Sequence, residues 1–93
     1  MTDQELNEAV ARKLGIELGN LKPRDYSTSI EAAWEVVEYL NKTKFHCCQL
    51  NVDGLNVKYG FWIGDRHSQK FFGEADTAPR AICLAFLKSR ELL

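Results

Sequence analysis

The residues with the most distinctive chemistry in this 93-residue chain are its histidines and cysteines. His46, Cys47 and Cys48 are consecutive, and His67 and Cys83 lie further along the chain. Thiolates and imidazoles are ligands that zinc prefers, but structural zinc sites use spacings such as Cys-x-x-Cys on a turn. The side chains of adjacent residues on a strand point to opposite faces instead. We therefore predict no metal site, and free thiols in a reducing cytosol.

A catalytic cysteine is not expected either. A cysteine nucleophile needs a positioned base and a partly exposed, electropositive setting that lowers its pKa. His46 and Cys48 are two residues apart, which places their Cα atoms about 7 Å apart on a strand without aligning the side chains. The chain has no Gly-rich phosphate loop, no His-Glu-x-x-His and no nucleophile elbow. The sequence favours a protein without enzymatic activity and without a cofactor.

Composition predicts one globular domain over residues 1–93, because 45 % of the residues are hydrophobic and 27 % are charged. Twelve Lys and Arg against thirteen Asp and Glu give a formal charge of −1, so nucleic acid is not an expected partner. No apolar run approaches the ~18 residues of a membrane span, and the start, Met1–Glu5, is acidic where a signal peptide is basic. We expect a cytoplasmic protein that does not bind membranes.

The apolar periodicity predicts three helices. The first begins at the capping box Thr2-x-x-Glu5 and ends at Gly15. The second begins at the capping box Thr28-x-x-Glu31, with Ser27 as the alternative cap. The third follows Asp76 or Thr77, with Pro79 in its first turn. The side chains predicted to be buried are Leu6, Val10 and Leu14 on the first helix, Ile30, Ala33, Trp34, Val37 and Leu40 on the second, and Ile82, Cys83, Ala85 and Phe86 on the third.

The polar face of the second helix carries an acidic row, Glu31, Glu35 and Glu38. Such a row can meet a basic partner, and it is also what a solvated helix face looks like. The solvated face is the simpler interpretation.

Asp53-Gly54 lies between two β-rich runs, which is typical of a two-residue type I′ turn. That turn fixes a register in which Val52 is opposite Leu55 and Leu50 is opposite Val57, on an apolar face that belongs in the core. Lys70–Ala75 is predicted to return as a third strand. The predicted fold is α+β, a three-stranded antiparallel meander packed with three helices in the order α-α-β-β-β-α.

The other face of the hairpin is the candidate binding surface. In the predicted register Asn51 is opposite Asn56 and Gln49 is opposite Lys58, with Trp62 at the open end. Adaptable polar groups beside aromatic area are typical of binding surfaces. The candidate partner-binding residues are Gln49, Asn51, Asn56, Lys58 and Trp62. The alternative is an ordinary exposed sheet face.

Two loops, Lys22–Tyr26 and Arg66–Lys70, carry much of the positive charge. If they lie together they could hold an anion, because Arg presents a fork that matches phosphate or carboxylate. Solvated loops are the simpler interpretation.

Two stretches of the chain are familiar. Tyr26–Val37 (YSTSIEAAWEVV) and Thr77–Cys83 (TAPRAIC) resemble the phage ABA sandwich domain, a family of small proteins from bacteriophages and prophages. The resemblance implies a phage protein of the bacterial host cytoplasm, with helices packed around a small sheet. It implies no activity and no site residues. The family name suggests a sheet covered on both faces, whereas the predicted register leaves one face open, and both readings stand at this point.

The expected function is that of a phage or prophage accessory domain that binds a host or phage protein. A small-molecule or nucleotide binder is an alternative, for which a closed pocket with converging arginine and aromatic side chains would be the sign. A minor enzyme is another, which would require a titratable residue with a shifted pKa in a cleft.

Overall fold

The computed structural model of the chain describes residues 2–16, 23–42, 47–53, 58–64 and 69–91, with the backbone alone at positions 41, 47–49, 51, 53, 69, 70 and 91. These ranges hold, in chain order, α1 (Asp3–Lys13), α2 (Ile30–Asn41), β1 (Cys47–Asp53), β2 (Lys58–Gly64), β3 (Gln69–Ala75) and α3 (Ala78–Glu91). The predicted α+β class, the three helices and the antiparallel pairing are confirmed.

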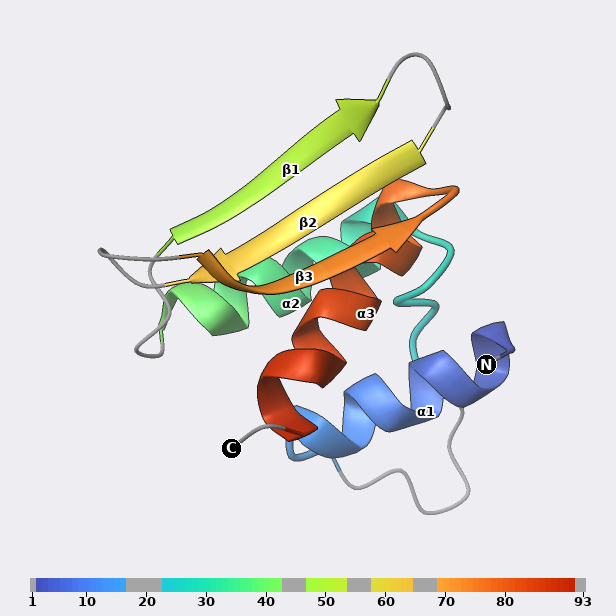
Figure 1. The fold of residues 1–93 in the computed structure, drawn as a ribbon. Helices are drawn as coiled ribbons and strands as arrows, with labels where there is room; N and C mark the ends of the chain where they lie inside the picture. Colours follow the sequence, from blue (N-terminus) through green and yellow to red (C-terminus); the bar gives the residue numbers. More distant parts are fainter. Residues whose placement is uncertain (1, 17–22, 43–46, 54–57, 65–68, 92–93) are drawn as a thin grey trace.

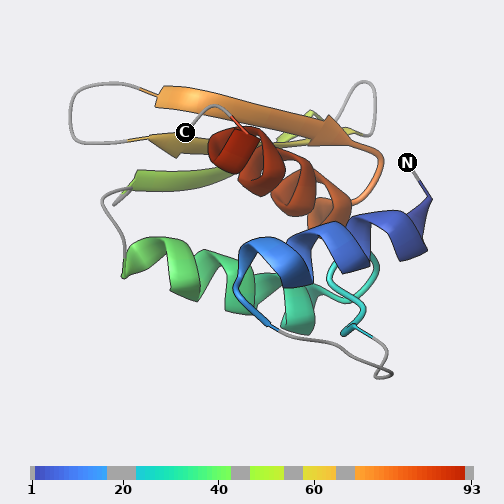
Figure 2. The same cartoon turned by 90° about the horizontal axis from the view of Figure 1, so that it is seen from below.

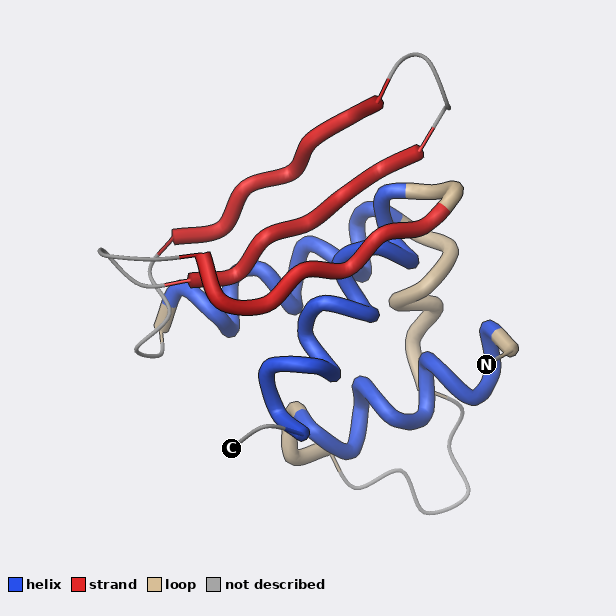
Figure 3. Tube along the Cα trace, viewed as in Figure 1, coloured by secondary structure: helices blue, strands red, loops and turns tan. Residues whose placement is uncertain are grey.

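The three helices lie on one side of the sheet (Figures 1 and 2). The strands are antiparallel in the order β1-β2-β3. α3 packs on β2 and β3. α1 and α2 also pack against α3. Figure 2 shows α3 between the sheet and the other two helices, and Figure 3 marks the helices and strands along the Cα trace. The other face of the sheet carries no helix in the described part of the chain.

Both ends of α1 form as the sequence predicts. The hydroxyl of Thr2 accepts the backbone N–H of Glu5, and the Glu5 carboxylate accepts the N–H of Thr2, which completes the capping box. At the other end Gly15 has φ 84°. The N–H of Gly15 donates to the Arg12 carbonyl and that of Ile16 to the Ala11 carbonyl, both at 3.0 Å. These two bonds are the Schellman motif, which requires the left-handed conformation that glycine adopts without strain.

The start of α2 differs from the prediction. Its N-cap is Ser29, whose hydroxyl accepts the N–H of Ala32 at 3.3 Å, and neither Thr28 nor Ser27 caps the helix. A turn comes first, because the N–H of Ser29 donates to the Asp25 carbonyl at 2.8 Å. Ser27 is buried within that turn, and its N–H donates to the Asn7 side-chain oxygen at 2.9 Å. Ser27 therefore joins α1 to the segment before α2.

The buried side of α2 is rotated relative to the prediction. Ala33, Val37 and Leu40 are buried as predicted, but Ile30 and Trp34 are each 50 % exposed. Ala32 and Val36 are buried in their place. The helix is apolar over a wide arc, and the smaller side chains of that arc are the ones packed into the core. The prediction that Trp34 belongs to the core is therefore wrong.

The predicted turn at Asp53-Gly54 is also wrong. Asp53 is still within β1 and pairs with Lys58, and Val52 pairs with Tyr59 instead of Leu55. The predicted partners of Leu50, Gln49 and Asn51 fail with it, because they pair with Phe61, Trp62 and Gly60. The connection, residues 54–57, lies outside the described residues, as does Val57. A displacement by four residues along β2 is even, so every strand residue keeps its predicted face.

The observed register leaves the apolar side chains of β1 on the face that meets the helices. The pairing sets Leu50 beside Phe61, which is 2 % exposed, on the face that meets the helices. Leu50 and Val52 themselves are 38 % and 61 % exposed, so their predicted burial is wrong. The reason is their position on β1, at the edge of the sheet, while α3 packs on β2 and β3.

The start and the buried residues of the last helix, α3, are as predicted. It begins at Ala78, so Pro79 lies in the first turn, and the Thr77 carbonyl accepts the N–H of Ala81 at 3.1 Å. Ile82, Cys83, Ala85 and Phe86 are all fully buried.

Gly73 on β3 allows this helix to approach the sheet closely. A Cβ atom added at Gly73 would lie 2.5 Å from the Ala81 carbonyl oxygen and equally close to the backbone of Ala85. Both neighbours are backbone atoms of α3, so the clash could be relieved only by moving the helix away from the strand.

We predict that Gly73→Ala lowers the free energy of unfolding by about 2–3 kcal/mol, because overpacking displaces α3. Gly60→Ala is the matched control on the neighbouring strand. There the added Cβ meets only the far end of the Phe72 ring, which can turn, so the loss should stay below about 1 kcal/mol. Urea unfolding measures both, and equal losses would contradict the role assigned to Gly73.

A second pair of variants tests the rotation of α2. Phe86 is fully buried, with the Tyr39 ring edge-on at 6.0 Å, so Phe86→Ala should cost about 3–5 kcal/mol. Half of Trp34 is exposed, so Trp34→Ala should cost less than about 1.5 kcal/mol. The same urea titration measures both variants. A large loss of unfolding free energy in Trp34→Ala would show that Trp34 belongs to the core.

Candidate functional site

The uncovered face of the sheet carries an aromatic pair. Trp62 of β2 is paired directly with Phe72 of β3, and their rings stack with centroids 4.4 Å apart and planes at 30°. Both side chains are partly exposed. Gly60 makes room for the pair, because a Cβ there would lie 2.5 Å from the Phe72 ring. Offset stacking of this kind gives an apolar platform on the sheet.

A charged pair borders this platform. Lys58 Nζ lies 3.6 Å from Glu74 Oε1, and both side chains are about half exposed. An exposed pair of this kind contributes little to stability, so its charges remain accessible to a partner. A shallow hollow of about 170 Å³ lies at the same place, and its lining consists of Val52, Lys58, Tyr59, Gly60, Trp62, Phe72 and Glu74. We call the set Lys58, Gly60, Trp62, Phe72 and Glu74 the outer sheet face.

This surface contains part of the predicted binding set. Lys58 and Trp62 both lie on it. Gln49 and Asn51 pair with Trp62 and Gly60, so the register places them on the same face, but their side chains lie outside the described residues. Asn56 lies outside them altogether.

The sequence did not point to Phe72 or Glu74 as site residues. Their place on this face follows from the pairing of β3 with β2.

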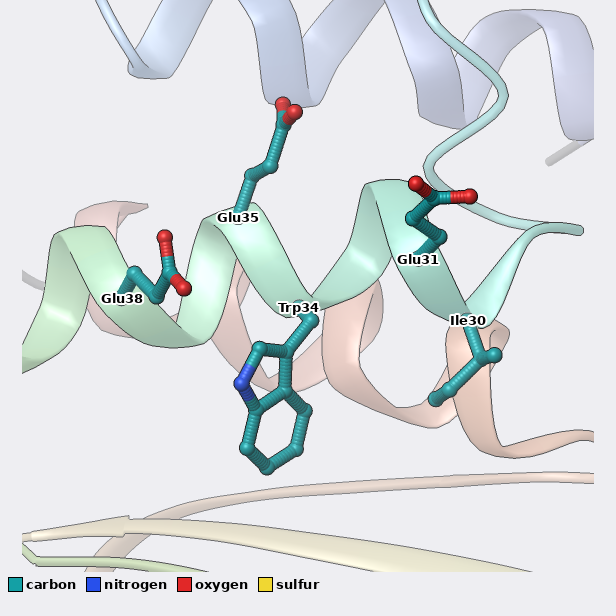
Figure 4. Close-up of a pocket in the computed structure, with 5 residues that line it drawn as sticks. All are labelled: Ile30, Glu31, Trp34, Glu35 and Glu38. Carbon is teal, nitrogen blue, oxygen red and sulfur yellow. The ribbon is translucent and has the colours of Figure 1, made fainter.

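A second hollow, of about 450 Å³, lies along α2 and is lined by Ile30, Glu31, Trp34, Glu35 and Glu38. Figure 4 shows Trp34 and Ile30 pointing toward the sheet, while Glu35 points the opposite way, toward α1. Glu35 has a partner, because Arg24 Nη1 lies 2.8 Å from its Oε1. We call these five residues the α2 groove. Sequence reasoning identified the glutamates but placed both apolar residues in the core.

The comparisons with known proteins agree with this fold. The model of the phage ABA sandwich domain family matches residues 10–87. The chain belongs to this family. Its fold is similar to that of a phage protein from Bacillus cereus ATCC 14579, known from a 2.0 Å crystal structure, with a TM-score of 0.79 and 30 % sequence identity. That similarity covers 96 % of this chain and 92 % of the Bacillus protein. No curated protein matches the chain.

Of the histidines and cysteines of this ABA sandwich domain, the structure describes the side chain of Cys83. Cys83 is fully buried on α3, and burial raises the pKa of its thiol to about 12. A thiol in that state is neither accessible nor ionised at neutral pH, so Cys83 is not a nucleophile. His46 and His67 lie outside the described residues, as do the side chains of Cys47 and Cys48. In the part of the chain that is described, no three His, Cys, Asp or Glu side chains gather as metal ligands.

The structure describes residues 23–26 of the first basic loop and the backbone of residues 69 and 70 of the second. Arg24 is held by Glu35 and is exposed. Lys22 and Arg66 lie outside the described residues, and so does the side chain of Lys70. Whether the loops lie together is therefore not tested by the described residues, and solvated loops stay the prediction. None of the described helices has the length and apolar character that crossing a bilayer requires.

The buried thiol gives a pH test. The pKa of Cys83 rises from 9.0 to about 12 on folding, so between these values the folded state retains a proton that the unfolded state has lost. The stability that the neutral thiol contributes is complete below pH 9 and is lost as the pH rises toward 12. We predict that the free energy of unfolding falls with pH more steeply in the parent than in Cys83→Ala, by up to about 1.4 kcal/mol per pH unit.

Urea unfolding at several pH values above 9 measures the two slopes. Tyr26 is common to both proteins, and its pKa is also raised, first by burial and next by the Glu35 carboxylate. Cys83 is the last and smallest of the causes that act on Tyr26, so most of the Tyr26 contribution is the same in both proteins. Parallel slopes would show that the Cys83 thiol ionises equally well in both states.

Proposed function

We propose that this ABA sandwich domain is a non-enzymatic phage module that acts by binding a host or phage protein in the bacterial cytoplasm, and that the outer sheet face is the binding surface. The observation that carries the proposal is the partly exposed Trp62–Phe72 stack, on a sheet face that none of the described helices covers. Aromatic side chains are enriched at the centres of protein interfaces, because they bury a large area at a low cost in conformational entropy.

The arrangement around the stack supports a protein as the ligand. Lys58 and Glu74 offer one charge of each sign next to the rings, so a partner is oriented by complementary charges and not attracted by a net field. The hollow beside the rings is shallow, at about 170 Å³, below the roughly 300–1,000 Å³ of small-molecule sites. Its size suits one protruding side chain of a partner protein.

The test is a pull-down from infected host cells with the tagged domain, followed by mass spectrometry. We predict that a double variant, Lys58→Glu with Asn51→Asp, loses the partner that the parent retains, because it places two new negative charges on the outer sheet face. Its melting curve should match that of the parent to within about 0.5 kcal/mol, since exposed substitutions seldom cost more.

Lys13→Glu provides the matched control. It reverses the charge of an exposed lysine on α1, away from the sheet, and should leave the interaction intact. Retention of the partner by the double variant would move the binding surface elsewhere. DNA is tested separately, by titration at low and moderate salt, where binding that survives physiological salt would contradict the proposal.

A further inference from the structure

The α2 groove combines exposed apolar area with an unusual local charge. Trp34 and Ile30 are each 50 % exposed, although they are among the largest apolar side chains of the helix. Two more exposed apolar residues, Leu50 and Val52, lie on β1 on the helix-facing side of the sheet, since they pair with Phe61 and Tyr59. Large apolar residues that cluster on a surface mark an interaction site more often than single ones do.

The charged side chains of α2 beside these exposed apolar residues are all acidic. Residues 30–41 of α2 include Glu31, Glu35 and Glu38 but no lysine or arginine, in a chain whose net charge is only −1. Arg24 binds Glu35 on the side away from Trp34. Among the described residues no ion pair holds Glu31 or Glu38, and the nearest cation along the helix is Lys42, its C-cap, one turn after Glu38.

We infer that the α2 groove binds a basic amphipathic helix of another protein, whose apolar side chains cover Trp34 and Ile30 and whose Lys or Arg side chains reach Glu31 and Glu38. The groove, at about 450 Å³, has room for several side chains. Glu31 and Glu38 are seven residues apart, about 10 Å along the axis, which a partner helix matches with basic residues at the same spacing. A cation placed over the Trp34 ring gains a further attraction.

This binding is separate from that of the outer sheet face, because the five residues of the α2 groove and the five of the outer sheet face do not overlap. Val52, which lines the hollow beside Lys58, belongs to neither set. The groove lies along α2 on the helical side of the domain, whereas Trp62 and Phe72 lie on the opposite face of the sheet. Variants on one surface should leave the other unaffected.

The experiment uses three fluorescein-labelled helical peptides of about 18 residues. The first has a leucine stripe flanked by lysine and arginine, the second has glutamate at every basic position, and the third scrambles the first. Fluorescence anisotropy with the full chain should detect binding of the basic amphipathic peptide only. Added salt should weaken that binding, since exposed charge pairs are screened.

Four variants locate the site. Trp34→Ala should weaken binding at least about tenfold, and the double variant Glu31→Gln with Glu38→Gln at least about fivefold. Glu74→Gln is the control that removes a carboxylate outside the α2 groove. Lys58→Glu is the control that changes the outer sheet face. Both should bind like the parent, and circular dichroism should show the same helix content in all of them.

Several results would overturn the inference. They are equal binding of the acidic or scrambled peptide, full affinity in Trp34→Ala, and binding by none of the three peptides. Light scattering is measured on the chain alone. A dimer that Trp34→Ala dissolves would assign the groove to a second copy of the chain instead of a basic helix.

Discussion

The close approach of α3 to β3 at Gly73 determines the rest of the architecture. With no side chain between them, the helix backbone lies against the strand, and a single methyl group would separate the two. α3 then fills the space between the sheet and the other helices, which buries Ile82 and Phe86 completely. The core lies on this one side of the sheet, between α3, β2 and the other two helices. In the described part of the chain no helix covers the other face, which carries Trp62 and Phe72.

The same constraint accounts for the difference between the two sheet edges. α3 packs beside β3, where Lys88 donates a hydrogen bond to the Phe72 carbonyl at 2.7 Å and occupies a backbone acceptor at that edge. β1 lies at the opposite edge of the sheet, where α2 makes few contacts with it. Leu50 and Val52 of β1 are exposed as a result. Among the described strands β1 is therefore an edge strand beside exposed apolar residues, which is a surface that proteins normally protect or use.

Local signals in the sequence predicted local structure well and tertiary placement less well. The Thr2 capping box and Gly15 are short-range features, so α1 was predictable from end to end. The register of β1 on β2 is a tertiary feature, and it differs from the register that the turn preference of Asp53-Gly54 predicts. For the candidate site, the alternation of strand residues placed Lys58 and Trp62 on one face despite the wrong register, whereas Phe72 required knowledge of the pairing of β2 with β3.

The two surfaces differ in what they can recognise. On the outer sheet face opposite charges stand side by side, so long-range attraction nearly cancels and selection depends on shape and short-range contacts with the rings. On α2 the charges have one sign, so a basic partner is attracted over about a Debye length, roughly 8 Å at physiological salt, before apolar contact begins. The two proposed surfaces lie on opposite faces of the sheet, so a partner on one of them does not occupy the other.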